Sequence, residues 1–207
     1  MVEKKEDTEK KILDAAENVF YKKGLDGARM QEIADEAGIN KSLLHYYYRS
    51  KDKLFEMVFK KAISSFIPKM SAIWESDASL FEKIELFVAK YTEIFRKKPF
   101  IPSFVLHELN RHPARLVNTM REAISDDRYK FFNGLQAQID YEVKKGTIKP
   151  VKLEHLIINL IGLCIFPYVA KPIMKGLFFE DNNKLYNQFL DERKKQVAEF
   201  IIDAIKK

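Results

Sequence analysis

Residues 29–48 read RMQEIADEAGINKSLLHYYY, and this stretch predicts two short amphipathic helices joined by a tight turn. Apolar residues recur at helical spacing on one face of its first half. Gly38 tolerates a positive φ at the turn, and Asn40 is a good N-cap for the helix that follows. The small side chain of Ala34 permits close helix crossing. Together these residues predict a helix-turn-helix over 29–48.

Helical periodicity continues on both sides of this motif. Residues 8–24 carry a single apolar stripe and end in KKG, which is a usual helix C-terminus. On the other side, Ser50 is placed to cap a helix whose apolar stripe continues to Pro68, where the helix ends or kinks. The helix-turn-helix is therefore expected inside a small N-terminal helical domain.

The rest of the chain also predicts helices. Glycine and proline number seven each, and no β-hairpin signal is present. We expect an all-α fold of about nine helices, with a three-helix helix-turn-helix domain over 6–66 and a helical bundle over 67–207. The helices expected in the bundle cover residues 79–97, 101–110, 114–145, 151–166 and 184–206.

Charge changes sign along the N-terminal domain. The chain carries a formal charge of +6. Residues 1–37 hold 7 Lys or Arg against 10 Asp or Glu, whereas residues 38–63 hold 6 against 2. The basic excess begins near Gly38, inside the predicted helix-turn-helix. Its position favours nucleic acid as a partner.

Several features of the sequence limit the cellular compartment and the kinds of site that we expect. Cys164 is the one cysteine, which excludes an internal disulfide and a cysteine-based zinc site. The charged N-terminus has no apolar segment typical of a signal peptide. The longest apolar run, residues 156–170, is shorter than the roughly 18–20 residues of a membrane span. We expect a cytoplasmic protein in which this run forms a buried helix or a subunit interface.

Residues 8–63 resemble the DNA-binding domain of the TetR family of bacterial transcriptional regulators. The family's usual pattern here is roughly I-A-x-x-A-G-V-S-x-G-T-L-Y-x-H-F-x-S-K-E-x-L. Close substitutes stand at Ile39, Asn40, Tyr48 and Asp52. The positions that match are Ile33, Ala34, Ala37, Gly38, Leu44, Ser50, Lys51 and Leu54.

The resemblance implies that the second helix of the motif enters the major groove of DNA. Lys41, Ser42 and Leu43 would then meet base edges, and Tyr46 or Tyr47 would donate to phosphates. The DNA-binding residues expected on this basis are Arg29, Gln31, Lys41, Ser42, Leu43, His45, Tyr46, Tyr47 and Lys51. The chain departs from the family pattern at Ala28, Arg29, Ser42, Leu43 and His45.

The aromatic C-terminal part is expected to bind a ligand and to form a dimer, as the resemblance implies. Rings at helical spacing are also typical of an ordinary core, so each pocket candidate has that alternative. The pocket candidates are Phe66, Trp74, Phe87, Tyr91, Phe104, His107, Phe131, Leu135, Cys164 and Phe166. The candidates for a homodimer interface are Leu156, Leu160, Leu163, Val197, Phe200, Ile201 and Ile205.

These predictions describe a transcriptional regulator, expected to be a repressor. As a homodimer it would bind a near-palindromic operator and be released by a small, largely apolar effector. An enzyme is not expected, because no nucleophile–base pair, metal-ligand cluster or Gly-rich phosphate loop stands out, and no cofactor or metal is expected. The open alternative is a helical ligand- or protein-binding module that has lost specific DNA binding.

Overall fold

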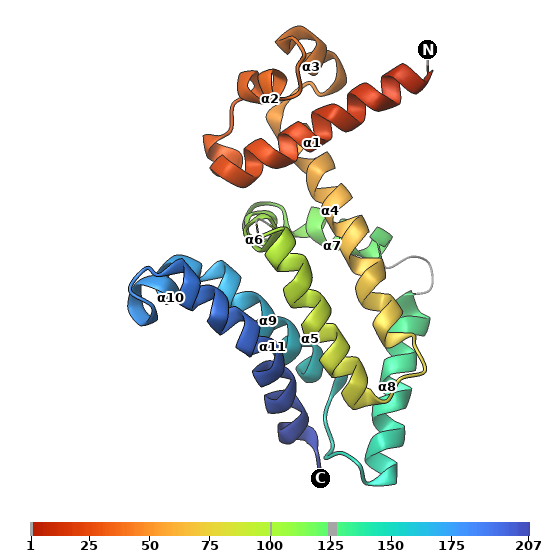
Figure 1. The fold of residues 1–207 in the computed structure, drawn as a ribbon. Helices are drawn as coiled ribbons and strands as arrows, with labels where there is room; N and C mark the ends of the chain where they lie inside the picture. The colour runs from red at the N-terminus through yellow and green to blue at the C-terminus, as the bar shows by residue number, and fades with distance from the viewer. Residues whose placement is uncertain (1, 100, 124–127) are drawn as a thin grey trace. The chain divides into compact units, whose positions relative to one another are not determined.

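The structure is a computed structural model that describes residues 2–99, 101–123 and 128–207 (Figure 1). The side chains of residues 2–5, 104, 108, 123 and 128–131 lie outside this description. The described chain forms eleven α-helices, and its only β-type pairing is an isolated bridge between Ile148 and Lys206. The predicted all-α fold is confirmed. The chain divides into two compact units, Met1–Ser65 and Phe66–Lys207.

The first unit contains α1 (Val2–Gly27), α2 (Met30–Glu36), α3 (Lys41–Tyr47) and the first part of α4 (Lys51–Trp74). The helix expected over 8–24 continues to Gly27, but it is broken at Gly24, where φ is 68° and ψ is −179°. This conformation is open to glycine and strained for other residues. The first helical segment therefore ends at the KKG sequence as predicted, and a further short helical segment follows to Gly27.

One apolar core holds the helices of the first unit together. The rings of Phe20 in α1 and Phe55 in α4 meet edge to face, with centroids 5.3 Å apart. Ile33 and Ala34 of α2 and Leu44 of α3 are fully buried. Because α3 buries Leu44 alone, the core fixes this helix through one anchor and leaves most of its surface outside.

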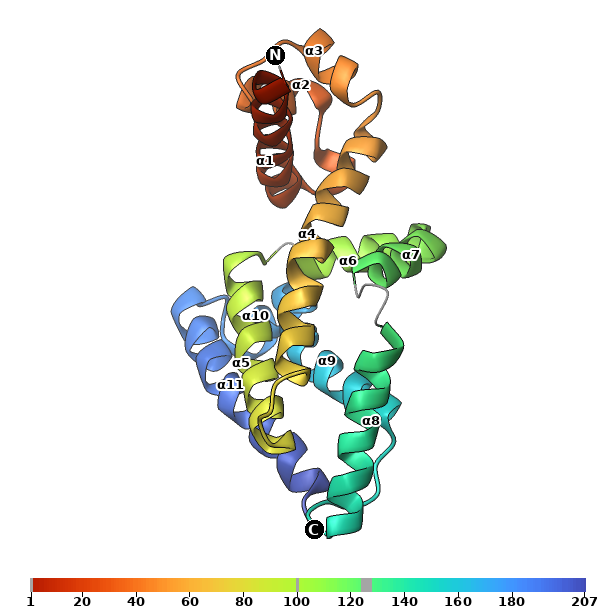
Figure 2. The ribbon, with the colours of Figure 1, turned by 90° about the vertical axis from the view of Figure 1, so that its right-hand side faces the viewer.

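The second unit is built around α5 (Leu80–Lys97), which packs against α8, α9 and α11 (Figures 1 and 2). Ser79 caps α5 by accepting from the Glu82 N–H at 3.3 Å, and Glu82 in return accepts from the Ser79 N–H at 2.8 Å. The remaining helices of this unit are α6 (Ile101–Arg111), α7 (Pro113–Ala123), α8 (Arg128–Lys145), α9 (Leu153–Val169), α10 (Lys171–Phe178) and α11 (Asn183–Ile205).

Aromatic rings fill the space between the last turns of α4 and the length of α5. Trp74 lies 5.4 Å from Phe87, and Phe66 meets Tyr91 edge to face at 5.2 Å, both measured between ring centroids. Lys83 is also buried here, where its Nζ donates to the Trp74 carbonyl and to Gln138 Oε1, each at 2.8 Å. Burial lowers the pKa of this lysine.

The prediction of about nine helices was too low. The segment expected as one helix over 114–145 is divided into α7 and α8, with residues 124–127 outside the description. The helix α10 was not predicted at all. In contrast, Pro68 does not end α4, which continues to Trp74.

The helix α9 is only partly buried within the single chain. A buried helix or a subunit interface was expected for the apolar run 156–170, and Ile158 and Phe166 of this run are 67% and 57% exposed. No single helix in the described part is long and apolar enough to cross a membrane. By length and composition alone, α9 and α10 pass that test together as a pair bent by 71°.

Candidate nucleic-acid interface

The turn between α2 and α3 sets the direction in which α3 leaves the core. Gly38 adopts φ 66°, and its N–H donates to the Asp35 carbonyl at 3.1 Å. The Ile39 N–H donates to the Ala34 carbonyl at 3.0 Å. Asn40 then caps α3, because its Oδ1 accepts from the Leu43 N–H at 2.7 Å. These contacts confirm the predicted turn and the predicted N-cap.

The outer face of α3 is a row of polar and amphipathic side chains. Lys41, Ser42 and His45 are exposed, and Leu43 is 37% exposed. They share a short helix whose first turn contains no acidic residue. The face can therefore donate hydrogen bonds and make apolar contacts without repelling a polyanion.

The three consecutive tyrosines have three different environments. Tyr46 is 74% exposed, and the edge of its ring meets the half-buried ring of Tyr47 at 5.6 Å between centroids. Tyr48 is 6% exposed, and its hydroxyl donates to Glu9 Oε1 at 3.1 Å, which ties α3 to α1. Burial is the main cause that raises the pKa of the Tyr48 phenol.

Lys51 is held by the protein itself. Its Nζ donates to the Ala28 carbonyl at 3.0 Å and to the Asp26 carbonyl at 3.4 Å, and the residue is half-buried. These two bonds stabilise the connection between α1 and α2. A lysine has three donors, so one remains for a phosphate. The sequence pattern did not reveal this structural role.

Arg29 and Gln31 lie exposed at the start of α2. Arg29 is the N-cap residue, but its guanidinium has no acceptor with which to cap the helix. Glu32 provides half of a capping box, since its Oε2 accepts from the Arg29 N–H at 3.3 Å. A hydrogen bond and ion pair with Lys23, with Nζ and Oε1 2.8 Å apart, help to lower the pKa of Glu32.

Two exposed cations beside α3 were missed as candidates. Arg49 precedes α4, and Lys53 lies in its first turn. Both belong to the basic run whose charge excess the sequence already displays. That excess was the available signal. The nine predicted DNA contacts remain predictions, and these two residues join them.

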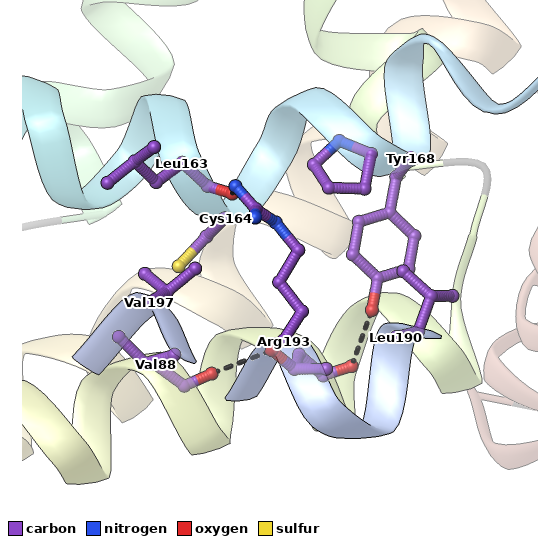
Figure 3. Close-up of a pocket in the computed structure, with 9 residues that line it drawn as sticks. Val88, Leu163, Cys164, Tyr168, Leu190, Arg193 and Val197 are labelled. Atoms are coloured by element: carbon purple, nitrogen blue, oxygen red, sulfur yellow. Dashed lines mark hydrogen bonds between the residues drawn. The ribbon is translucent and has the colours of Figure 1, made fainter. Parts of the chain in front are cut away.

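The predicted ligand-pocket residues mostly belong to the core of the second unit. Trp74, Phe87 and Tyr91 pack against one another, Leu135 is buried, and Phe66 and His107 are half-buried. Phe166 points outward. The side chains of Phe104 and Phe131 lie outside the description. Only Cys164 lines the hollow between α5, α9 and α11 that is drawn in Figure 3.

Most of the predicted dimer residues are also buried within the single chain, and the dimer interface stays a prediction. Leu156, Leu160, Val197, Ile201 and Ile205 are each at most 7% exposed within a single chain, so they belong to its own core. Leu163 is half-buried and Phe200 is 66% exposed. An apolar helix has more than one apolar face, and the sequence alone did not show which face the chain itself covers.

Other apolar side chains on the same helices are exposed instead. Their spacing along α9 is helical, and they lie away from its buried stripe. The exposed apolar residues of α9, α10 and α11 are Ile158, Ile161, Phe166, Ile173, Leu177, Phe178, Leu185 and Phe200. These eight residues are called the outer apolar face below.

Comparison with known proteins decides the family. The sequence model described as "Bacterial regulatory proteins, tetR family" matches residues 12–58, the span that holds the helix-turn-helix. The chain belongs to the TetR family. As a TetR-family protein it is a DNA-binding transcriptional regulator. The family consists of regulators, not enzymes.

Individual TetR-family relatives extend the likeness beyond that domain. The HTH-type transcriptional regulator RutR of Escherichia coli (strain K12) is 28% identical over 148 residues, or 72% of this chain and 68% of RutR. The HTH-type transcriptional repressor NicS of Pseudomonas putida is 41% identical over 59 residues, or 28% of each chain.

The likeness in three dimensions covers almost the whole chain. The crystal structure of a TetR/AcrR-family transcriptional regulator from Thermobifida fusca superposes with a TM-score of 0.65 at 18% identity. The alignment covers 93% of this chain and 97% of that one. At this identity the agreement concerns the fold, including its helical C-terminal region.

Metal binding has no candidate site in the described residues. Among them, no group of three or more His, Cys, Asp or Glu side chains could hold an ion.

Proposed function

We propose that this regulator is a repressor that binds a near-palindromic operator as a homodimer and releases it when a small ligand binds. The observation that carries the proposal is the outer face of α3. It presents Lys41, Ser42, Leu43 and His45 to solvent and is held to the core by Leu44. A recognition helix needs this arrangement, because the side chains that read bases cannot also pack inside.

The proposed DNA contacts are of two kinds: contacts to base edges, which read the sequence, and contacts to phosphates, which position the protein on the DNA. Lys41 can donate to guanine O6 or N7, Ser42 can donate or accept, and Leu43 can contact a thymine methyl. The exposed Tyr46 hydroxyl and the Arg49 guanidinium are suited to phosphate oxygens, which fix the register but carry no sequence information.

Further phosphate contacts are assigned to the flanks of α3. Arg29 and Gln31 flank it on the α2 side, and Lys51 and Lys53 flank it on the α4 side. Tyr47 is half-buried and contributes chiefly by supporting the ring of Tyr46.

A second copy of the chain explains the outer apolar face. Ile158, Ile161 and Phe200 are large apolar residues left in water by a single chain. Large exposed apolar patches usually mark an interface. A C2 dimer would present two α3 helices about one turn of DNA apart, roughly 34–36 Å, and so match a near-palindromic site.

Regulation would then run through α4, which begins beside the DNA-binding residues and ends among the aromatic rings of the second unit. A ligand that prefers one arrangement of the second unit would change the spacing of the two α3 helices. The effect on DNA affinity cannot exceed the ligand's own preference between the two states.

A footprint on the DNA upstream of the protein's own gene tests this proposal. We expect protection of two half-sites whose centres lie about 10 base pairs, or a multiple of that, apart. A helical module without specific DNA binding would protect no defined site there or on genomic fragments selected by the protein. That outcome would favour the alternative of a ligand- or protein-binding module.

A further inference from the structure

A histidine stands on the outer face of α3. The chain has four histidines, and His45 is the only one in the unit Met1–Ser65. It is exposed and lies in the last turn of α3, with Lys41 about one helical turn before it. The TetR pattern has tyrosine at this position, and a tyrosine is ordinarily uncharged near neutral pH. His45 therefore brings to this face a side chain that can gain a positive charge.

The imidazole of His45 is not used by the rest of the described chain. Its side chain makes no hydrogen bond, ion pair or ring contact with any described residue. Both ring nitrogens are therefore available to a partner, and a protonated imidazole donates from both. The C-terminal end of a helix also favours a positive charge, because its last carbonyls point there.

Acidic side chains on the helices next to α3 already have partners. They are Glu9 of α1, whose carboxylate accepts from Tyr48, and the three carboxylates of α2, Glu32, Asp35 and Glu36, which accept from Lys23, Gln31 and Asn18. The segment 49–53 that leads into α4 holds three cations and one carboxylate: Arg49, Lys51, Lys53 and Asp52. A proton on His45 therefore adds to a local surplus of positive charge in the free protein, and DNA phosphates would relieve that surplus.

We propose that His45 binds DNA in its protonated form, so that operator binding takes up a proton at each half-site. The protonated ring donates to an acceptor on the DNA, which is either a phosphate oxygen or the O6 or N7 atom of guanine. The inference rests on the function proposed above, since α3 must lie in the major groove for His45 to reach either acceptor.

Proton uptake makes operator affinity depend on pH. Histidine side chains ordinarily change charge between about pH 5 and 8. Because the complex favours the charged form more than the free protein does, affinity is higher at the acidic end of this range and falls as the pH rises. One charge-assisted hydrogen bond corresponds to a change in affinity of about 10-fold. The pH of the surroundings thus acts on the same helix that reads the operator.

Fluorescence anisotropy at about pH 6, 7 and 8 and constant ionic strength tests the proposal, with the duplex protected in the footprint as the probe. The affinity of the wild type should rise about 10-fold or more from the highest pH to the lowest. His45→Gln cannot take up the proton, so its affinity should change little with pH. His45→Lys is charged throughout the range, so its affinity should also be flat, but tighter than that of His45→Gln at the highest pH. His155→Gln, an exposed histidine of α9, is the matched control and should keep the wild-type pH dependence.

Two further measurements count the proton and locate the acceptor. Calorimetric titration in two buffers of different ionisation enthalpy gives the number of protons taken up on binding, which should be positive for the wild type and lower for His45→Gln. A scrambled duplex distinguishes the two kinds of acceptor. A phosphate contact gives the same pH dependence on both duplexes, whereas a base contact confines the pH dependence to the operator.

The outcomes separate this inference from the proposed function. Circular dichroism at each pH checks that the variants are folded. An operator affinity that does not rise toward acidic pH, or that rises equally in His45→Gln, would overturn the inference and leave the proposed function intact. Failure to prefer the operator over the scrambled duplex at any pH would instead overturn the proposed function, and the inference with it.

Discussion

Tyr46 and Tyr48 are two residues apart in the sequence, yet one hydroxyl faces solvent and the other holds α1 to α3. The backbone explains the difference, because Tyr46 lies on the outer face of α3, whereas Tyr48 is the C-cap residue and is extended, with φ −133° and ψ 105°. Because the two hydroxyls differ in this way, the same substitution of tyrosine by phenylalanine is expected to affect DNA binding at Tyr46 and folding stability at Tyr48.

We expect removal of the two hydroxyls to have different effects, one on DNA affinity and the other on the free energy of unfolding. Tyr46→Phe should lower DNA affinity several-fold and leave the free energy of unfolding unchanged, since its hydroxyl is exposed. Tyr48→Phe should lower the free energy of unfolding by about 1 kcal/mol, because the bond to Glu9 is lost. Fluorescence anisotropy and urea unfolding measure the two effects. Equal losses of stability in both variants would contradict the assignment.

Lys51 and Lys41 form a second informative pair at the residue scale. Lys51→Ala removes the donor of the Asp26 and Ala28 carbonyls, so we expect a loss of about 1 kcal/mol of stability together with weaker DNA binding. Lys41→Ala should weaken DNA binding alone, because Lys41 is exposed. Thermal unfolding followed by circular dichroism distinguishes them, and an unchanged melting temperature for Lys51→Ala would show that the two bonds contribute nothing.

At the element scale, local signals predicted α2 and α3 well. Gly38 and Asn40 act through the backbone of their own turn, so the sequence shows their roles directly. The helix α10 has weaker signals: its N-cap, Ala170, makes no side-chain cap bond, and Gly176 lies inside it, so Pro172 in its first turn is the one helix-start signal among these features. The hydrogen bond from Arg193 to the Leu163 carbonyl joins residues 30 positions apart, and no local sequence pattern predicts it.

That pairing can be tested with a double-mutant cycle. Arg193→Met should lower the free energy of unfolding by about 1 kcal/mol in the wild type, since the Leu163 carbonyl loses its donor. In a Pro167→Ala background the cost should be smaller, because the backbone N–H of the introduced alanine can donate to the Leu163 carbonyl within α9. Urea unfolding of the four proteins gives the coupling energy. A coupling near zero would show that Arg193 does not compensate for the proline.

At the scale of the whole molecule, the outer apolar face was the hardest feature to predict. Periodicity marks α9 and α11 as apolar, and it correctly placed apolar residues along both. It does not say which of two apolar faces a helix turns toward its own chain. Five of the seven interface candidates are buried within the single chain, whereas Phe200 is exposed as an interface would require, and the interface itself stays a prediction.

Placing a charge on that face tests the dimer. Phe200→Glu should convert the dimer to a monomer in sedimentation velocity and reduce operator affinity, since two linked half-sites bind more tightly than one. Leu86→Glu is the matched control, because Leu86 is an exposed apolar residue of α5 outside the outer apolar face. A dimer that survives Phe200→Glu, or that is lost equally in Leu86→Glu, would contradict the proposed interface.

The most direct test of the central claim is fluorescence anisotropy with an operator duplex and a scrambled duplex, each titrated at several salt concentrations. The wild type should prefer the operator, and its affinity should fall steeply with salt as phosphate contacts release counter-ions. Lys41→Ala should lose about 10-fold or more of the preference for the operator while its weak binding to the scrambled duplex changes little. Equal affinity for both duplexes, unaffected by Lys41→Ala, would mean that α3 does not read DNA.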